Sequence, residues 1–210
     1  MKDAYIAAKE RWARKMAGQT QSVPRSSDRL PPGQRLVTDF PVLDLGVHPE
    51  IAAQDWTLRI HGLVKRPTTL DWDQFLALPQ FTDTSDFHCV TTWSQYDMVW
   101  QGAAFLTLAD LVEPAATATH VFFKAADGYT TNVSLAALMD DDVLIAHTWN
   151  GRPLTKEHGG PARVIVPKLY AWKGAKWVKE ILFLDHDVLG FWERRGYSNT
   201  ADPWAEDRFA

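Results

Sequence analysis

The chain has 210 residues, of which 46% are hydrophobic and 23% are charged, and it carries a formal net charge of -4. This is the composition of one ordinary globular domain, and the negative balance excludes a general attraction to nucleic acid phosphates or anionic lipid. No apolar run approaches the roughly 20 residues that cross a bilayer. The first residues, "MKDAYIAAKERWARKMAG", scatter their charges instead of placing a basic end before an apolar stretch, so we expect a cytoplasmic protein without a secretory signal.

The N-terminal segment differs in pattern from the rest of the chain. Residues 1–17 are predicted to form a helix with mixed charges, and the following "GQTQSVPRSSDRLPPGQR" is rich in Ser, Pro and Gly, which indicates an extended arm or linker. We therefore divide the chain into residues 1–37, a helix with an extended arm, and residues 38–210, the main domain.

Short strands separated by turns dominate the first part of the main domain. "DWTLRIHG" alternates Trp56, Leu58 and Ile60 on one face, as a half-buried strand does. "THVFFKAADGYTTNV" indicates two strands around Asp127-Gly128. Short helices are predicted at "TLDWDQFLALP", "TLADLV" and "SLAALMDDD", because each begins with a Thr or Ser that can cap a helix N-terminus.

The C-terminal half also favours strands. "VLIAHTWNGRPL" places Asn150-Gly151 between two apolar runs, which predicts a tight hairpin because both residues tolerate positive φ. "ARVIVPKLYAWKGAKWVKEILFL" predicts strands at 162–167 and 176–184, joined by a basic aromatic loop. Without internal repeats or long helices alternating with strands, the pattern excludes a doubly wound sheet and predicts a mixed α+β fold that is mostly strand.

Cys89 is the only cysteine, and it ends the predicted strand "QFTDTSDFHC". A buried apolar role is one interpretation, since free cysteines are frequently buried. A nucleophile would need a base such as His88, His147 or His158, of which His88 is the least suitable because adjacent strand residues point to opposite faces. Structural zinc is excluded, because no second cysteine or paired histidines supply the ligands. One thiolate can still hold a metal whose other ligands come from a cofactor.

The loop "KLYAWKGAKWVK" is a candidate cofactor site. Its lysines, its rings and the small Gly174 suit a phosphate attached to a flat heterocycle. Upstream, "EHGGPARVIV" adds His158, a Gly-Gly turn and Arg163, whose planar guanidinium can bind a phosphate with two donors. The ten tryptophans fit such a ligand as well, although most of them are expected to pack in the core. A solvated basic hairpin remains the alternative interpretation of this loop.

Three stretches together, "FHCVTTWS", "GGPARVIVPKLYAWKGAKWVKEILFL" and "GFWERRGYSNTADPW", resemble the molybdenum-cofactor domain of the sulfite oxidase superfamily. The resemblance is to its compact prokaryotic branch, which is related to the catalytic subunit of the periplasmic methionine sulfoxide reductase, and it covers about 40–204. It implies a sulfite-oxidase-type molybdopterin-binding fold over residues 38–210, with the molybdenum-molybdopterin cofactor and an unidentified electron-transfer partner.

The resemblance also implies roles for individual residues. Cys89 takes the place of the thiolate that binds molybdenum, so that the pterin dithiolene supplies the other sulfurs. The remaining cofactor contacts implied are Phe40, Leu43, Asp44, His158, Arg163, Lys173, Gly174, Ala175 and Lys176. Trp93 and Tyr96 are expected in the substrate pocket.

The chain also departs from relatives in this superfamily. The residues after Cys89, "VTTWSQYD", contain none of the substrate-binding arginines of true sulfite oxidases, which argues against sulfite as the substrate. Neither the haem domain of the animal enzyme nor a dimerisation domain is found, so the electron carrier and the oligomeric state stay open.

The sequence leaves three alternative functions for this chain. The leading one is a molybdenum-dependent oxidoreductase that transfers an oxo group, or carries out related redox chemistry, on a small substrate. The second is a cysteine hydrolase or transferase with Cys89 as nucleophile and a histidine as base. The third is a non-catalytic module that binds an anionic ligand through the basic aromatic loop.

Overall fold

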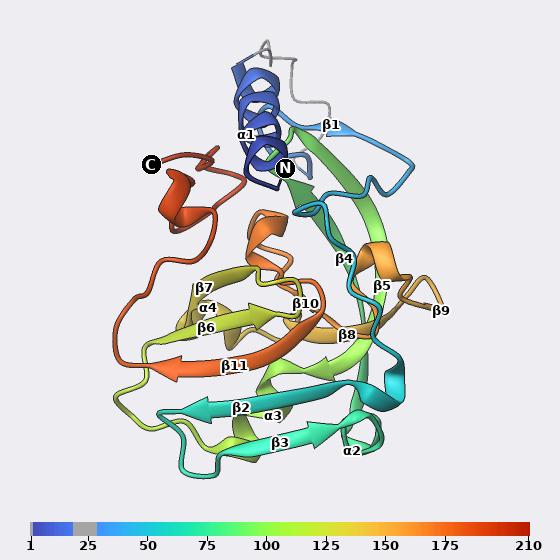
Figure 1. Cartoon of the computed structure of the whole chain (residues 1–210), viewed down its shortest axis with the longest axis vertical. Helices are drawn as coiled ribbons and strands as arrows, with labels where there is room; N and C mark the ends of the chain where they lie inside the picture. Colours follow the sequence, from blue (N-terminus) through green and yellow to red (C-terminus); the bar gives the residue numbers. More distant parts are fainter. Residues whose placement is uncertain (1, 19–28) are drawn as a thin grey trace.

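The computed structural model describes residues 2–18 and 29–210, so residues 19–28 of the predicted arm lie outside the described part. The predicted N-terminal helix is present as α1, Lys2–Gly18. Two sheets make up most of the main domain, with short helices between their strands (Figure 1). The α+β fold class, mostly strand, is confirmed. In the described ranges no helix is long and apolar enough to cross a membrane.

The first sheet carries Cys89. Its central strand β5 pairs with β1 in parallel and with β4 and β8 in antiparallel fashion, and β8 pairs in turn with β9 and β10. In Figure 1, β4 and β5 are the two long strands that run side by side along one edge of the molecule. The strands are β1 Arg35–Leu36, β4 Gln80–Cys89, β5 Trp93–Ala104, β8 Leu144–Trp149, β9 Arg152–Pro153 and β10 Arg163–Ile165.

The second sheet has the order β3-β2-β11-β6-β7, in which β2 and β11 are parallel and the other neighbours are antiparallel. Strand β2 confirms the predicted alternation, because Leu58 and Ile60 are buried while Thr57 and Arg59 are exposed and His61 is half-buried. The strands are β2 Thr57–Gly62, β3 Thr68–Asp71, β6 His120–Ala125, β7 Thr130–Ser134 and β11 Val178–Leu184.

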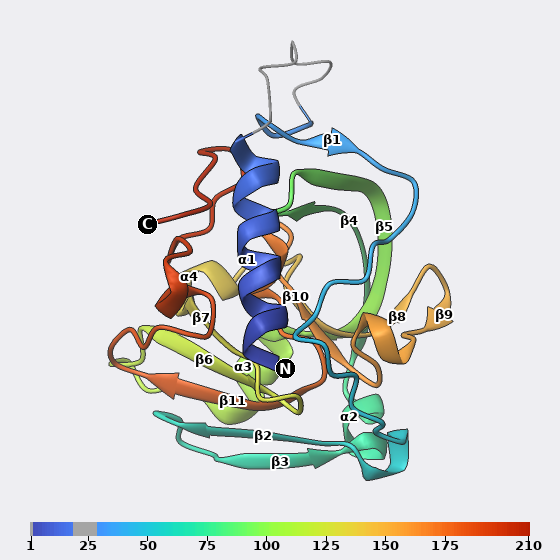
Figure 2. The ribbon, with the colours of Figure 1, turned by 45° about the horizontal axis from the view of Figure 1, so that its top comes forward.

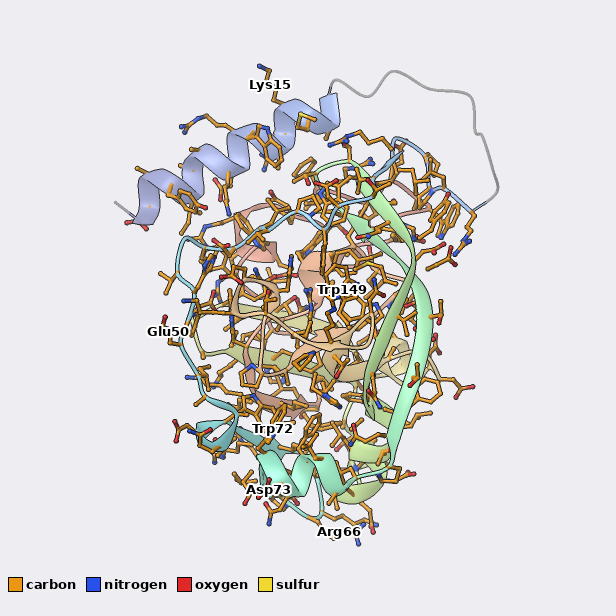
Figure 3. The ribbon with its side chains drawn as sticks, turned by 90° about the vertical axis from the view of Figure 1, so that its right-hand side faces the viewer. Lys15, Glu50, Arg66, Trp72, Asp73 and Trp149 are labelled. Atoms are coloured by element: carbon orange, nitrogen blue, oxygen red, sulfur yellow. The ribbon has the colours of Figure 1, made fainter. Side chains whose placement is uncertain are left out.

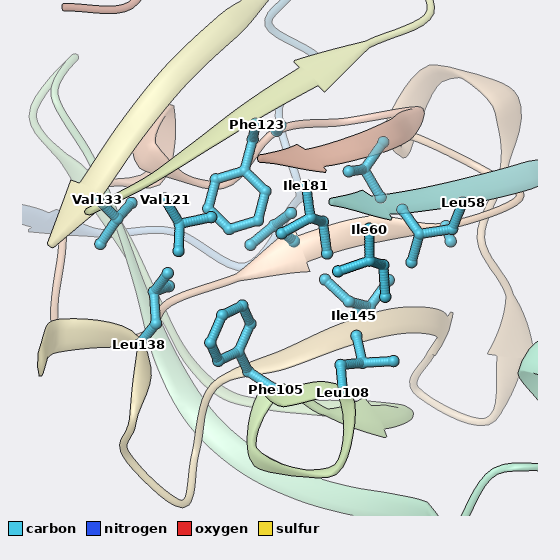
Figure 4. Packing of buried hydrophobic residues seen from close by; sticks show 14 of the residues in the cluster. Leu58, Ile60, Phe105, Leu108, Val121, Phe123, Val133, Leu138, Ile145 and Ile181 are labelled. Atoms are coloured by element: carbon cyan, nitrogen blue, oxygen red, sulfur yellow. The ribbon is translucent and has the colours of Figure 1, made fainter. Parts of the chain in front are cut away.

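The main core lies on one face of the second sheet. Apolar side chains of β2, β6, β7 and β11 pack against helices α3, Phe105–Val112, and α4, Leu135–Leu138, and against β8 of the first sheet (Figure 4). Full burial of each such side chain contributes roughly 1.5–3 kcal/mol. A second cluster surrounds Cys89 and contains Phe87, Trp93 and Trp100.

Two of the predicted helix starts are wrong. Helix α2, Trp72–Ala77, is capped by Asp71, whose side chain accepts from the Gln74 N–H at 2.8 Å while the Gln74 side chain accepts from the Asp71 N–H at 3.0 Å. The threonines before it belong to β3, because pairing with β2 extends them. Helix α3 begins at Phe105 without a side-chain cap, so Thr107 lies inside it.

Other local predictions are confirmed. Ser134 caps α4 by accepting from the Ala137 N–H at 3.3 Å. Asn150 and Gly151, with φ of 47° and 74°, turn the chain between β8 and β9. The strands expected at 162–167 and 176–184 are present as β10 and β11, but they belong to different sheets, so the loop between them bridges the two sheets.

Candidate functional site

Cys89 is the last residue of β4, as predicted, and it sits opposite Trp93, the first residue of β5. The chain turns between them through three residues, with Thr92 in the left-handed region at φ 69° and its N–H donating to the Cys89 carbonyl at 3.1 Å. A three-residue hairpin loop needs one such left-handed residue. The turn leaves Cys89 only 6% exposed, with Sγ 3.1 Å from the Thr91 hydroxyl.

The surroundings of Cys89 oppose a nucleophilic role. Burial raises the pKa of its thiol, against the smaller opposing effects of Thr91 and Lys9. Reactive cysteines have the opposite character, because only the thiolate attacks a substrate.

None of the three candidate bases contacts Cys89 in the described part of the chain. His88 Nδ1 lies 2.8 Å from the Ser94 hydroxyl, which keeps it on the other side of the strand. His147 contacts Gln80 and Thr148, and His158 stacks on Phe40. The structure therefore offers no support for the cysteine hydrolase.

Cys89 opens instead onto a cavity, with about 950 Å³ of space between atoms, part of it open to solvent. The predicted residues that line it are Cys89, Trp93, Phe40, Leu43, Asp44, His158, Arg163, Gly174 and Lys176. Segments far apart in the sequence thus meet at one place, as the resemblance implies.

Arg163 is the most deeply buried cation of the cavity wall, at 4% exposed. Its guanidinium donates to the His158 carbonyl at 3.1 Å and lies 5.4 Å from the centre of the Phe87 ring, while its Nε has no hydrogen-bond partner in the described ranges. Burial lowers the pKa of Arg163 to about 9, which leaves it protonated at neutral pH. A buried, under-bonded guanidinium is costly unless an anion completes its hydrogen bonds.

Lys176 supplies a second cation. Its Nζ donates to the Glu157 carbonyl at 2.8 Å and lies 4.5 Å from the centre of the Trp177 ring. Burial, and then the nearby Arg163, lower the pKa of Lys176 to about 7. A bound anion would reverse this shift, because it stabilises the charged ammonium.

Two glycines let the backbone approach closely beside these cations. A Cβ on Gly174 would lie 2.6 Å from the Val164 carbonyl oxygen, and a Cβ on Gly159 would lie 2.8 Å from the Cβ of Lys176. Gly159 also has a φ of 102°, which side chains other than glycine rarely adopt. The loop therefore packs onto β10 only with glycine at 174.

Aromatic rings form much of the remaining wall. Phe40 stacks on His158 with ring centres 4.1 Å apart and an angle of 5°, and Trp149 meets the same imidazole edge-on. Burial lowers the pKa of His158 to about 4, with the charges of Arg163 and Lys176 adding to the effect. His158 is therefore a neutral, flat surface at neutral pH, which suits a heterocyclic ligand.

Asp44 is the buried carboxylate of the site. Burial acts to raise its pKa, but hydrogen bonds with His48, at 2.6 Å, and with the Gly46 N–H, at 2.7 Å, outweigh that effect and hold the pKa below its ordinary value. Asp44 therefore stays ionised and can accept hydrogen bonds from the N–H groups of a ligand.

Three predicted site residues are not brought to the cavity. Lys173 is fully buried elsewhere, where its ammonium lies 2.7 Å from Glu193. Ala175 packs in the main core, and the Tyr96 ring lies under the Arg29 guanidinium at 4.4 Å. None of the three is among the lining residues that the structure describes.

Other lining residues were missed by the sequence analysis. They are Lys9, Trp12, Ala13, Pro41, Leu45, Phe87, Val90, Thr91, Asp127, Tyr129, Ala171, Trp177, Trp192 and Tyr197, whereas Trp172, a ring of the predicted loop, does line the cavity. Several are neighbours of predicted residues or belong to the quoted tail "GFWERRGYSNTADPW". Lys9, Trp12 and Ala13 of α1 could not be predicted as lining residues, because the mixed charge pattern of this helix does not indicate which surface it packs against.

The residues of the cavity fit a molybdopterin cofactor. The chain contributes one thiol, the buried cation Arg163 with an unsatisfied guanidinium nitrogen, the half-buried cation Lys176, a glycine-lined loop and flat rings. The thiol suits a metal that takes one sulfur ligand from the protein, and the cations and rings suit a heterocycle that carries a phosphate.

Comparison with known proteins leads to the same cofactor. The family model described as "Oxidoreductase molybdopterin binding domain" matches residues 45–192. The uncharacterized oxidoreductase YuiH of Bacillus subtilis is 41% identical over 184 residues, which cover 87% of this chain and 93% of that protein. The protein-methionine-sulfoxide reductase catalytic subunit MsrP of Gluconobacter oxydans is 32% identical over 157 residues, which cover 66% of this chain and 50% of that protein.

A solved structure shows the same fold. The sulfane dehydrogenase SoxCD of Paracoccus pantotrophus superposes with a TM-score of 0.63 over 71% of this chain and 42% of that chain, at 24% identity. The sulfite-oxidase-type fold predicted from the sequence is thereby confirmed. The mitochondrial sulfite oxidase of Drosophila melanogaster is 29% identical over 180 residues, which cover 71% of this chain and 30% of that protein. The chain belongs to the family of oxidoreductase molybdopterin-binding domains and is a sulfite-oxidase-like enzyme that uses the molybdenum cofactor.

Proposed function

We propose that the chain carries out oxo transfer, or closely related redox chemistry, on a small substrate, with Cys89 as the protein ligand to molybdenum. The cofactor supplies a redox-active metal together with two sulfur ligands. The observation that carries the proposal is the position of the lone buried thiol, without a histidine partner in the described residues, at a cavity lined by Arg163 and Lys176.

Thr91 has a defined part in this proposal. A bound metal would favour the thiolate form of Cys89, which burial alone disfavours. The Thr91 hydroxyl, 3.1 Å from Sγ, can then only donate to the sulfur. Thr91 therefore orients the ligand and moderates its charge.

The other residues divide by chemistry. Arg163 and Lys176 provide the charge that holds the phosphate of the cofactor, and Gly174 lets the loop backbone lie close to it. Phe40 and His158 offer flat faces for the pterin. Trp93 lies opposite Cys89 across the hairpin and lines the cavity, and we propose that it flanks the substrate.

Sulfoxides are the first substrates to test. The residues after Cys89 hold no arginine, which disfavours sulfite, and one relative carries the name of a protein-methionine-sulfoxide reductase. We propose that the chain reduces a sulfoxide or a similar oxo donor with electrons from a partner protein that is still unidentified.

The test is metal analysis and pterin fluorescence on protein made in cells that synthesise the cofactor. We expect molybdenum and pterin in equal amounts, together with oxidation of a reduced viologen by methionine sulfoxide that Cys89→Ser abolishes. Ester or amide turnover by metal-free protein, lost after alkylation of Cys89, would instead support the hydrolase. Absence of molybdenum, with Cys89→Ser equal to the parent, would refute the proposal.

A further inference from the structure

Helix α1 lies across the cofactor cavity, although it precedes the region that the family model matches. Figure 2 shows it in front of the main domain, between the C-terminal segment and the chain that follows β1. Its residues Lys9, Trp12 and Ala13 line the cavity, and Ile6 and Ala13 are buried. Ile6, Lys9 and Ala13 are spaced so that they share one helix face.

One side of α1 is held by the segment that carries predicted cofactor contacts. The Lys9 ammonium donates to the Asp44 carbonyl oxygen and lies 3.6 Å from the Asp44 carboxylate. The Tyr5 ring lies against Gly46, where an added Cβ would come within 3.0 Å of it. Asp44 itself lines the cavity, so these contacts connect the helix directly to the site.

The other side of α1 is held by the C-terminal segment. Glu10 pairs with Arg195 at 3.4 Å, and the Arg14 guanidinium lies 4.5 Å from the centre of the Phe209 ring. Partly exposed ion pairs of this kind contribute little individually. Besides the buried side chains of Ile6 and Ala13, the helix is held by individually weak polar contacts, so a ligand beneath it can influence whether it stays docked.

We infer that α1 is a wall of the cofactor site, that Lys9 adds the third cation that faces the anionic cofactor, and that α1 docking and cofactor binding stabilise one another. The inference rests on the proposed function of the cavity. Lys9 lines the same cavity as Arg163 and Lys176, so its ammonium adds to the positive charge around this space. If cofactor binding stabilises the docked helix, the docked helix must stabilise the bound cofactor by the same free energy. The effect of the cofactor on α1 and the effect of α1 on the cofactor can therefore be measured separately.

The first measurement follows the helix. Hydrogen exchange of the backbone amides of α1 is compared in the full chain with cofactor bound and in the same chain made without cofactor. We expect exchange in α1 to be slower with cofactor by on the order of tenfold, within the usual range of coupling between two sites. Equal exchange in the two forms would overturn the inference.

The second measurement follows the cofactor. Release of molybdenum and pterin is timed for Lys9→Gln and for its matched control Lys15→Gln, which removes the same charge from the same helix at an exposed position pointing away from the main domain (Figure 3). We expect release from Lys9→Gln to be about tenfold faster than from the parent. Release from Lys15→Gln and from Lys9→Arg is expected to match the parent.

The cofactor-free melting temperatures of these variants separate a local effect from general unfolding. Equal melting temperatures with faster release from Lys9→Gln support the inference, whereas equal release from Lys9→Gln and Lys15→Gln overturns it. A parent protein that holds no molybdenum or pterin would refute the proposed function itself. The molybdenum and pterin content of the parent protein is measured first, so failure of the proposed function is distinguished from failure of this inference.

Discussion

Two lysines of one loop, Lys173 and Lys176, have different surroundings and therefore different expected roles. The Lys173 side chain and its partner Glu193 are each 1% exposed, and the ammonium also donates to the Asn132 carbonyl at 2.9 Å. Glu193 accepts in addition from the Trp172 indole at 3.1 Å. Lys173 therefore fixes the loop from behind, whereas Lys176 lines the cavity.

Replacing each lysine by methionine should separate these roles. Lys173→Met leaves the Glu193 carboxylate buried without its cation, so we expect the free energy of unfolding to fall by about 3–5 kcal/mol. Lys176→Met should change it less but should lower the molybdenum and pterin content of the purified protein. Urea unfolding of cofactor-free protein and metal analysis measure the two effects. Cofactor loss from Lys173→Met without loss of stability would contradict this assignment.

His158 predicts a dependence of stability on pH. Its pKa is about 4 in the folded protein and about 6.5 when unfolded, so between these values the unfolded chain binds more protons. The free energy of unfolding must therefore fall as the pH falls from 6.5 to 4, by at most about 1.4 kcal/mol per pH unit from this residue. His158→Asn should flatten the curve measured by urea unfolding of cofactor-free protein. Parallel curves for variant and parent would contradict the lowered pKa.

For individual residues, the sequence predicted the location of Cys89 but not those of Lys173 and Tyr96. Cys89 was correctly placed at a strand end, because alternation and the following polar turn define that end locally. The burial of Lys173 was not predictable, because its partner Glu193 is distant in the sequence and meets it only through the tertiary fold. Tyr96 was expected near the substrate, but its place on β5 past the turn carries it to Arg29.

The loop between β10 and β11 is the element on which the site depends most. It leaves the first sheet at β10, passes through a short helical turn at Ala171–Lys173 and enters the second sheet at β11. The N–H of Val164 donates to the Ala175 carbonyl at 2.9 Å, which fixes the loop against β10. Gly174 lies at the point of closest approach.

Gly174→Ala should disturb this loop. The added Cβ would lie 2.6 Å from the Val164 carbonyl oxygen, so the backbone must shift, and we expect a loss of about 1–3 kcal/mol together with lower cofactor content. Gly151→Ala is the control, because its φ of 74° makes alanine costly by about 1–2 kcal/mol although its Cβ would meet nothing within 4 Å. If both variants keep the cofactor equally, Gly174 has no special part in the site.

Element prediction succeeded where the signal was local. The alternation in β2 and the turn at Asn150-Gly151 each involve residues within one short segment. The starts of α2 and α3 were predicted wrongly because strand pairing sets where each helix begins: β3 pairs with β2 as far as Asp71, and β5 pairs with β8 as far as Ala104. The separation of β10 and β11 into two sheets also depends on long-range pairing, so a hairpin-like sequence did not reveal it.

The whole molecule joins two sheets through this loop and covers the resulting cavity with α1. Helix α1 and the C-terminal segment lie near each other at the top of Figure 1, and the contact of Arg14 with Phe209 connects them. The division at residue 37 and the cytoplasmic location stay predictions. The shared site of Cys89, Arg163 and Lys176 was available from the sequence through the family resemblance, whereas the wall formed by α1 required the structure.

The most direct test of Cys89 as the metal ligand is the number of sulfur atoms bound to molybdenum, measured by X-ray absorption at the molybdenum edge. The parent protein should show three sulfur ligands, two from the cofactor and one from Cys89, and Cys89→Ser should show two while still containing pterin. Three sulfur ligands in both proteins would contradict the assignment of Cys89, and with it the role proposed for this cavity.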